Sequence, residues 1–242
     1  KYLYMKFDGY CLPGIYAEEA IDHFVGNHGQ RLRLPNLVDD VSYQHAISKR
    51  KDTYELRLKY GIPAKKRVFF CPARLLKLKG LDLFLKSAGK VKGISNACFL
   101  LAGEGPMKKE LQDIADKENL DVHFMGYCNQ DTVIEFYALS DFFFLPSLQD
   151  CNPLSAIEAA FAGLPLCVSI YTGNSPELIQ PYKNGVVFDI LDTEEVQACI
   201  YFLLNASEEW VSNAGRESLA IAQNSFACIN ETKKFLAQLR EG

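Results

Sequence analysis

The chain has 242 residues, of which 48% are hydrophobic and 23% are charged. This composition is typical of one large or two small globular domains, and it excludes a long disordered or fibrous protein. The formal net charge of -4 provides no general attraction to nucleic acid, so no nucleic-acid partner is expected. No apolar run approaches the ~20 residues that a helix needs to span a bilayer.

The cysteine pattern indicates a reducing environment. The eight cysteines are scattered and form no Cys-x-x-Cys pair, and most of them lie in apolar stretches. They are therefore interpreted as reduced core residues of a cytoplasmic protein rather than as a disulfide scaffold. The four histidines show no metal-ligand spacing, so no metal site is expected.

The first part of the chain does not form a regular alternation of strands and helices. The expected elements are a strand at 8–12, a helix at 16–25, a strand at 30–34 and a charged helix at 48–60. The last helix precedes Gly61 and Pro63, which are good stop signals. These elements are too few to bury an independent core. Residues 1–66 are thus interpreted as the trailing edge of a preceding domain plus a linker.

From residue 67 onward, short apolar runs alternate with helical patterns. The runs are expected to be strands at 68–71, 97–102, 122–125, 141–145, 165–169 and 186–188. Such alternation predicts an α/β fold, a doubly wound parallel Rossmann-like sheet with helices on both faces. We assign residues 67–225 to this domain. Residues 226–242 are expected to form a C-terminal helix that crosses back to the preceding domain.

Basic residues follow the first of these strands. Arg74 and Lys79 come after the strand that ends at Cys71, and Gly80 precedes a helical pattern. Ligands of doubly wound folds bind beyond the carboxyl ends of the strands, where Arg and Lys are well placed to hold phosphates. The alternative interpretation is a solvated charged loop, and the residues favour the two interpretations equally.

A glycine-rich turn follows the second strand. Gly103-Glu104-Gly105-Pro106 resembles a phosphate-binding turn, but Lys108 stands where the dinucleotide fingerprint needs its third glycine. Taken alone, the sequence predicts only a tight turn.

The segment from Asp150 to Glu158 is the third candidate. Asn152 is a good N-cap and Pro153 a good first helical residue, so a helix is expected to begin here and to present free amides to an anion. Glu158 opens an apolar stretch, where an unpartnered carboxylate is costly. A function is therefore favoured for Glu158, whereas Asp150 can equally stabilise the helix dipole.

These stretches together resemble the C-terminal half of the family 4, or group 1, retaining glycosyltransferases. The matching segments are 34–39, 73–80, 103–106, 124–127, 140–147 and 150–165, in the order that the family has them. The last of them is similar to the family's Glu-x7-Glu signature, with Asp150 in the first position and Glu158 in the second. Each segment is weak alone, but six in order are strong.

The resemblance implies a two-domain glycosyltransferase B-type fold and a set of roles. Arg74 and Lys79 would neutralise the donor diphosphate without a metal or other cofactor, and Glu158 would hold the ribose hydroxyls and Asp150 the sugar hydroxyls. The remaining implied donor contacts are Gly105, Tyr127, Cys128, Asn152, Pro153, Leu154 and Ser155. The donor would be a UDP-, GDP- or ADP-sugar. The acceptor would be a glycan or a lipid-linked molecule of polysaccharide or lipopolysaccharide synthesis.

Two departures from the family pattern qualify this expectation. Asp150 is one methylene shorter than the usual Glu, and at most the final strand and helix of an acceptor domain are present. The chain is thus expected to bind donor without transferring sugar by itself, in the cytoplasm or at the inner face of the membrane, where the full-length protein could associate peripherally. The alternatives are a non-catalytic nucleotide-sugar-binding module and a nucleotide-sugar epimerase of the same architecture.

Overall fold

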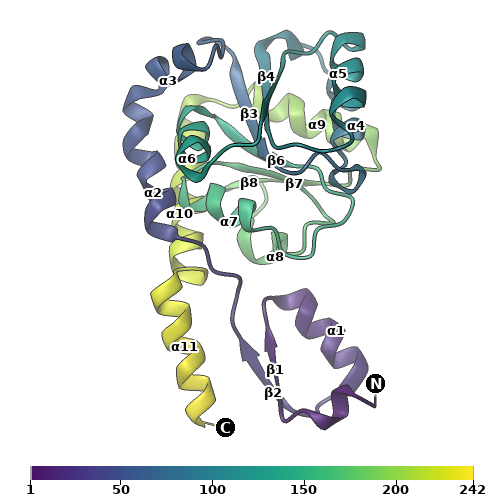
Figure 1. Ribbon diagram of the computed structural model, residues 1–242, viewed down its shortest axis with the longest axis vertical. Helices are drawn as coiled ribbons and strands as arrows, with labels where there is room; N and C mark the ends of the chain where they lie inside the picture. The colour runs from purple at the N-terminus through teal and green to yellow at the C-terminus, as the bar shows by residue number, and fades with distance from the viewer. Residues whose placement is uncertain (1, 242) are drawn as a thin grey trace.

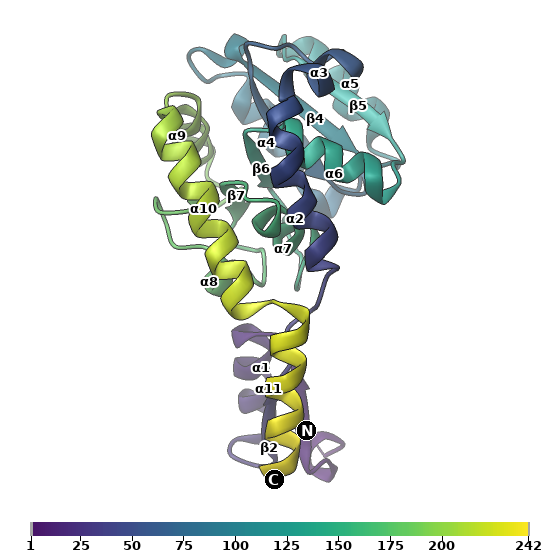
Figure 2. The same cartoon turned by 90° about the vertical axis from the view of Figure 1, so that its left-hand side faces the viewer.

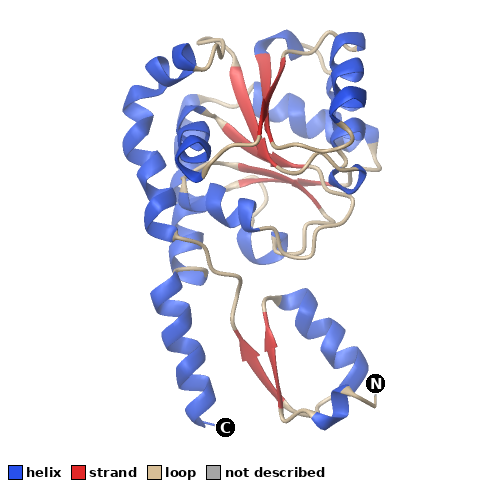
Figure 3. Ribbon diagram, in the orientation of Figure 1, coloured by secondary structure: helices blue, strands red, loops and turns tan. Residues whose placement is uncertain are grey.

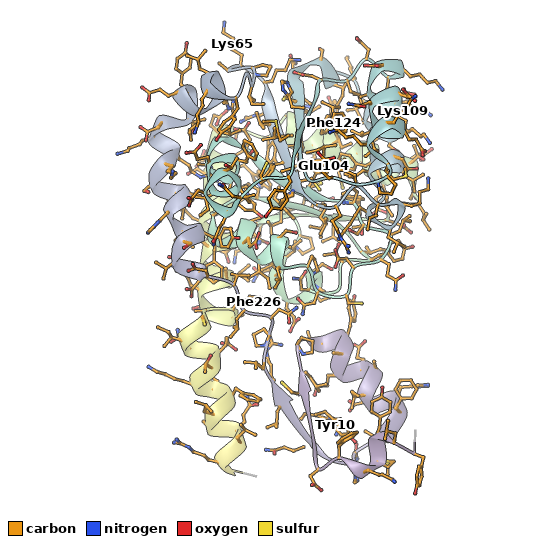
Figure 4. The ribbon with its side chains drawn as sticks, viewed as in Figure 1. Tyr10, Lys65, Glu104, Lys109, Phe124 and Phe226 are labelled. Atoms are coloured by element: carbon orange, nitrogen blue, oxygen red, sulfur yellow. The ribbon has the colours of Figure 1, made fainter. Side chains whose placement is uncertain are left out.

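The computed structural model describes residues 2–241, which form a large sheet domain and a smaller unit beside it (Figure 1). The smaller unit contains η1 (Tyr4–Lys6), β1 (Gly9–Leu12), α1 (Ile15–Val25) and β2 (Gln30–Arg33). Its two strands are parallel, with Gly9 opposite Gln30. Tyr10, Leu12 and Val25 form its own small buried cluster. Figure 4 labels Tyr10 within this unit, well away from the large domain.

Six parallel strands form the central sheet of the large domain. They are β3 (Arg67–Pro72), β4 (Ala97–Ala102), β5 (Val122–Gly126), β6 (Phe142–Leu145), β7 (Leu166–Ser169) and β8 (Gly185–Phe188). Their spatial order is β5-β4-β3-β6-β7-β8. Each observed strand lies within two residues of its predicted range. The prediction of a doubly wound Rossmann-like sheet is confirmed.

Helices cover both faces of this sheet (Figure 3). The helices of the large domain are α2 (Asp40–Lys49), α3 (Thr53–Lys59), α4 (Leu81–Ala88), α5 (Lys108–Lys117), α6 (Gln130–Leu139), α7 (Leu154–Phe161), α8 (Ser175–Leu178), α9 (Thr193–Leu204) and α10 (Glu208–Ser225), with 3-10 turns η2 (Arg50–Asp52), η3 (Lys77–Lys79) and η4 (Ile94–Asn96). Helices α4, α5 and α9 lie on one face, and α2, α3, α6, α7 and α10 lie on the other (Figure 1).

Closely packed aromatic rings fill both interfaces between the sheet and the helices. On the α4 face, the ring centroids of Phe84 and Phe144 are 4.7 Å apart. On the α6 face, Phe70 meets Tyr137 edge to face at 5.0 Å. Because apolar side chains point to both faces from each strand, the sheet is buried on both sides, as parallel sheets generally are.

The helix predicted at 48–60 begins eight residues earlier, so this prediction is wrong. Asp39 caps α2, with its carboxylate accepting a hydrogen bond from the Ser42 amide at 3.2 Å. The chain then turns through η2 before α3 begins. Tyr43, Ala46 and Ile62 belong to the core of the large domain, so this part of the predicted linker packs against the sheet domain.

Two segments connect the large domain with the smaller unit, and they lie side by side. One is the segment before α2, and the other joins α10 to α11 (Cys228–Glu241). The Cys228 amide donates a hydrogen bond to Asp40 Oδ2 at 3.1 Å, and Phe226, labelled in Figure 4, is fully buried beside it. Helix α11 then runs along the smaller unit (Figure 2), where Gln238 Oε1 accepts a hydrogen bond from the Arg33 amide at 2.9 Å.

No helix within residues 2–241 has the length and apolar character needed to cross a membrane.

Candidate donor site at the switch point of the sheet

The order of the strands places a switch point between β3 and β6. The chain runs outward from β3 to β5 on one side of the sheet and from β6 to β8 on the other. The loops after β3 and β6 therefore leave the sheet in opposite directions, and the crevice between them is where doubly wound folds bind ligands. The two strongest sequence candidates, 74–80 and 150–158, follow these two strands.

The loop after β3 brings Lys79 to the loop after β6. The Lys79 ammonium forms an ion pair with Asp150 Oδ2, and both side chains are mostly buried. The Leu148 amide also donates to the Leu78 carbonyl at 2.8 Å, which ties the backbones of the two loops together. The predicted pair of loops thus meets at one point.

Arg74 differs from Lys79 because its side chain is exposed. Among the residues that the structure describes, none forms an ion pair with its guanidinium. An exposed Arg at the carboxyl end of a central strand can offer a planar pair of donors to a phosphate.

The glycine turn after β4 packs against the loop that carries Arg74. Backbone hydrogen bonds join the Leu75 amide to the Glu104 carbonyl at 3.0 Å and the Met107 amide to the Leu75 carbonyl at 3.1 Å. A Cβ at Gly105 would lie 2.3 Å from the Leu75 carbonyl oxygen, so only glycine permits this approach. The structure therefore places the backbone of Gly105 against the loop that carries Arg74.

Helix α7 begins one residue later than the sequence pattern predicts. Pro153 occupies the N-cap position with an extended backbone, and no side chain caps the helix. Asn152 is not the N-cap, because its side chain is used elsewhere. Its amide donates to the Pro13 carbonyl at 3.3 Å, and its oxygen accepts from Asn174 Nδ2 at 3.2 Å. The first-turn amides of Leu154 and Ser155 have no partner within the helix.

Glu158 lies one turn into α7, in a partly buried position. Its Oε2 accepts a hydrogen bond from the Tyr137 hydroxyl at 3.0 Å. Burial raises the pKa of the Glu158 carboxyl, while hydrogen bonds from Tyr43 and Tyr137 act in the opposite direction. A group in this position accepts hydrogen bonds from ligand hydroxyls most strongly while it is ionised.

The loop after β5 carries the residues expected around the base. Tyr127 is 87% exposed, and the Cys128 thiol lies 3.6 Å from the Gly126 carbonyl. A Cβ at Gly126 would meet Glu104 Oε1 at 2.8 Å, which brings this loop against the glycine turn after β4. Figure 4 labels Glu104 at that turn, close to Phe124 of β5. Among the described residues, no hydrogen bond joins Tyr127 or Cys128 to Glu158.

Tyr43 and Tyr137, the two tyrosines whose hydroxyls lie near Glu158, belong to no motif of the sequence. Tyr137 lies in the helical run 130–139, and its ring is fully buried. A buried tyrosine hydroxyl generally needs a partner, but the sequence does not show which polar group the fold brings to it.

One group of side chains elsewhere has metal-ligand chemistry. Ligand atoms of Cys98, Asp121 and His123 lie within 4.8 Å of one another, at the amino ends of β4 and β5. Both Asp121 oxygens already have partners, His123 Nε2 at 3.0 Å and the Lys66 ammonium at 2.9 Å. This group is satisfied by protein contacts and lies at the opposite end of the sheet from the donor site.

Comparison with known proteins identifies the family. Residues 52–217 match the family model described as glycosyl transferases group 1, which covers more than half of the chain. The chain belongs to this family of glycosyltransferases, as the six ordered motifs indicated.

Similar proteins share the sequence pattern and the fold. N-acetyl-alpha-D-glucosaminyl L-malate synthase of Bacillus anthracis is 25% identical over 202 residues, which is 82% of this chain and 52% of that protein. A glycosyltransferase of Rickettsia africae superposes with a TM-score of 0.83 at 14% identity, over 98% of this chain and 64% of the other. Anabaena HepE, solved in complex with UDP and glucose, gives 0.79 at 18% identity, over 99% and 65%. The chain thus spans about half the length of its curated relative.

Proposed function

We propose that this chain forms the nucleotide-sugar-binding part of a retaining group 1 glycosyltransferase, with its donor site at the switch point between β3 and β6. The observation that carries the proposal is the convergence of Lys79, Asp150 and the start of α7 at that point. The family assignment and the fold shared with a UDP-bound structure support it.

Each wall of the site suits a different part of the donor. Arg74, Lys79 and the amides of Leu154 and Ser155 provide positive charge and hydrogen-bond donors for a diphosphate. Glu158 provides an acceptor for ribose hydroxyls. When the bond between the sugar and the diphosphate breaks, the nucleoside diphosphate departs with the electron pair. The acceptor oxygen forms the new bond to the sugar, and the proton of the acceptor hydroxyl passes to the departing diphosphate. The positive groups stabilise the negative charge that develops on the leaving diphosphate, with no metal required for that role.

The remaining donor contacts extend the site on both sides. We place the base near Tyr127 and Cys128, with Gly105 shaping the adjacent loop, and the sugar near Asp150. Asn152 and Pro153 set the direction in which α7 starts. UDP-, GDP- and ADP-sugars all fit this arrangement as a class.

The acceptor side of the site is proposed to lie towards the smaller unit. That unit faces the carboxyl ends of the strands, because Asn152 contacts the Pro13 carbonyl and Arg33 pairs with Glu177 of α8. We propose a glycan or lipid-linked acceptor and transfer in the cytoplasm or at the inner membrane face. The eight free cysteines of the structure support a reducing compartment.

Isothermal titration calorimetry tests the proposal with UDP, GDP, ADP and their sugar conjugates. We expect saturable binding of at least one of these nucleotides, without detectable sugar transfer by residues 1–242 alone. If none of these nucleotides binds, the proposed donor site is wrong. Transfer by the isolated chain would show that it needs no further acceptor domain.

Replacement of Glu158 by Gln separates a binding role from a structural one. We expect E158Q to lower nucleotide affinity by roughly tenfold, because a carboxylate accepts stronger hydrogen bonds than an amide. Glu135→Gln is the matched control, since Glu135 also accepts a tyrosine hydroxyl but pairs with lysines away from the site. Lower stability of E158Q with unchanged affinity would assign Glu158 a structural role.

The competing function is a binding module without transferase activity. The observation that favours it is the ion pair in which Asp150 contacts Lys79. Complementation of the 242-residue chain with an acceptor domain from a homologue, followed by a transfer assay, distinguishes the two functions.

A further inference from the structure

Tyr137 contacts α7 at two places at once. Its hydroxyl lies 3.0 Å from Glu158 Oε2 and 3.1 Å from the Ser155 carbonyl oxygen. Its ring is fully buried and packs against Phe70 of β3. A rigid, buried aromatic residue thus links the core of the sheet to the start of the helix that carries the donor site.

Tyr43 reaches the same carboxylate from a different element. It lies on α2, is 8% exposed, and meets the Tyr137 ring edge to face with centroids 5.8 Å apart. Burial, together with the nearby Glu158 carboxylate, raises the pKa of the Tyr43 hydroxyl, which also lies near Gln130 of α6. Tyr137 thus donates a hydrogen bond to the Glu158 carboxylate, and the Tyr43 hydroxyl lies near the same group from a second helix.

The segment that precedes Tyr43 also contacts the donor site. Asn36 Nδ2 donates a hydrogen bond to the Asn152 carbonyl at 3.2 Å, just before α7 begins. Asp39 then caps α2 and fixes the first turn of the helix that carries Tyr43. The connection from β2 to the large domain is thus attached to the donor site at Asn152, and it leads directly into the helix that carries Tyr43.

The arrangement has a clear electrostatic consequence. A carboxylate in a partly buried position tends to take up a proton, and donors directed at it oppose that tendency. The titratable groups that face Glu158 are Tyr43 from α2 and Tyr137 from α6, and Cys71 of β3 lies beyond Tyr137. Burial raises the pKa of both tyrosines, so they remain protonated donors across the neutral range.

We propose that Tyr43 and Tyr137 are positioning residues that keep the Glu158 carboxylate ionised and orient it towards the donor ribose. This inference rests on the proposed function of Glu158. Neither tyrosine needs to touch the ligand, because each acts through the carboxylate. The helix α2, which follows the connection to the smaller unit, thereby becomes part of the donor site.

Tyr43→Phe and Tyr137→Phe test the inference, because each removes only a hydroxyl. Nucleotide affinity of the 242-residue chain is measured by calorimetry between pH 5.5 and 8.5, with the nucleotide that the wild type binds best. We expect affinity at pH 8 to fall roughly tenfold in Tyr137→Phe and by less in Tyr43→Phe, because a carboxylate that is no longer oriented forms weaker hydrogen bonds with the ligand. Loss of binding on acidification should begin at a higher pH than in the wild type.

Tyr60→Phe is the matched control. Tyr60 also donates its hydroxyl to a carboxylate, Glu135, at 2.5 Å, but this pair lies away from the donor site. We expect its affinity and pH profile to equal those of the wild type. E158Q should bind weakly with the acid limb removed, and adding Tyr137→Phe to it should have little further effect.

The outcomes separate the two proposals. Wild-type affinity and an unchanged pH profile in both tyrosine variants, with E158Q still weak, would overturn the positioning role and leave the donor site intact. A wild-type chain that binds none of the nucleotides would overturn both. Equal thermal unfolding of the three tyrosine variants excludes misfolding as the cause of any loss.

Discussion

The two walls of the proposed donor site are built by different means. The wall after β3 presents Arg74 on an exposed loop, and close backbone contacts hold that loop in place. The wall after β6 presents Glu158 in a partly buried position, and side-chain hydroxyls hold it. One wall thus depends on glycines that allow backbones to approach, and the other depends on tyrosines that donate hydrogen bonds. A positive side chain that binds a flexible diphosphate can therefore be exposed, whereas a directional hydrogen-bond acceptor needs a carboxylate held in a fixed orientation.

The largest expected effect comes from a substitution that breaks a backbone contact of the wall after β3. A Cβ at Gly80 would lie 2.1 Å from the Pro146 carbonyl oxygen, and the residue has a φ of +64°. We expect Gly80→Ala to lower the free energy of unfolding by about 3 kcal/mol, measured by chemical denaturation. Gly93→Ala is the control, because Gly93 has a φ of +85° with nothing near its Cβ. That change should cost only about 1 kcal/mol, and equal losses would show that the contact with Pro146 is unimportant.

A smaller effect concerns the charge on the same wall. We expect Arg74→Ala to weaken nucleoside diphosphate binding by roughly 10- to 100-fold, because one charge-assisted contact to phosphate is lost. Binding of the corresponding nucleoside should hardly change, whereas E158Q should weaken both ligands. Calorimetry measures the affinity of each variant for the two ligands. Equal losses of affinity for the nucleoside and the nucleoside diphosphate in the Arg74 variant would contradict separate roles of the two walls.

Asp150 joins the two walls, and its replacement should affect the binding of two ligands differently. In Asp150→Asn, Lys79 loses its carboxylate partner, so we expect a nucleoside diphosphate to bind about threefold more tightly. The nucleotide sugar should gain less or bind more weakly, because Asp150 is proposed to accept from sugar hydroxyls. Titration of both ligands gives the ratio, and a parallel gain for both would exclude Asp150 from sugar recognition.

The smallest expected effect is a pH dependence of stability from the second wall. Burial raises the pKa of Glu158 above its ordinary value of 4.5. Its contribution to stability is therefore fully present below pH 4.5 and is lost as the pH rises through the folded value. We expect E158Q to gain stability relative to the wild type over this rise in pH, measured by urea unfolding. Glu135→Gln should show the reverse trend, since its lysine and tyrosine partners lower the pKa of Glu135.

The sequence predicted the parts of the fold that depend on local patterns. The strands could be predicted because their apolar runs are short and bounded. The loops of the site could be predicted because Arg74, Lys79 and Glu158 follow two of these runs along the chain. The start of α2 was missed because its apolar face is narrow and mixed with polar residues, although Asp39 and Ser42 form a good cap.

Contacts between distant segments could not be predicted from the sequence. Asn152 has the composition of an N-cap, but its side chain is taken by Pro13 and Asn174, which are 139 and 22 residues away along the chain. The contact of Tyr137 with Glu158 likewise depends on how two helices pack on one face. Motif spacing therefore located the charged groups of the site, while the groups that orient them became visible only in three dimensions.

The connection between the smaller unit and the large domain has a mechanical consequence. Residues before α2 and residues after α10 both contribute to the smaller unit, so the large domain is topologically an insertion between them. The two crossings are joined by the hydrogen bond from the Cys228 amide to Asp40. Any rigid-body rotation of the smaller unit relative to the large domain must bend both connecting segments together. Because these segments are adjacent, they define a single pivot line. That line passes at Asp40, within one helical turn of Tyr43, so a rotation of the smaller unit would also move α2, the helix whose Tyr43 lies near Glu158.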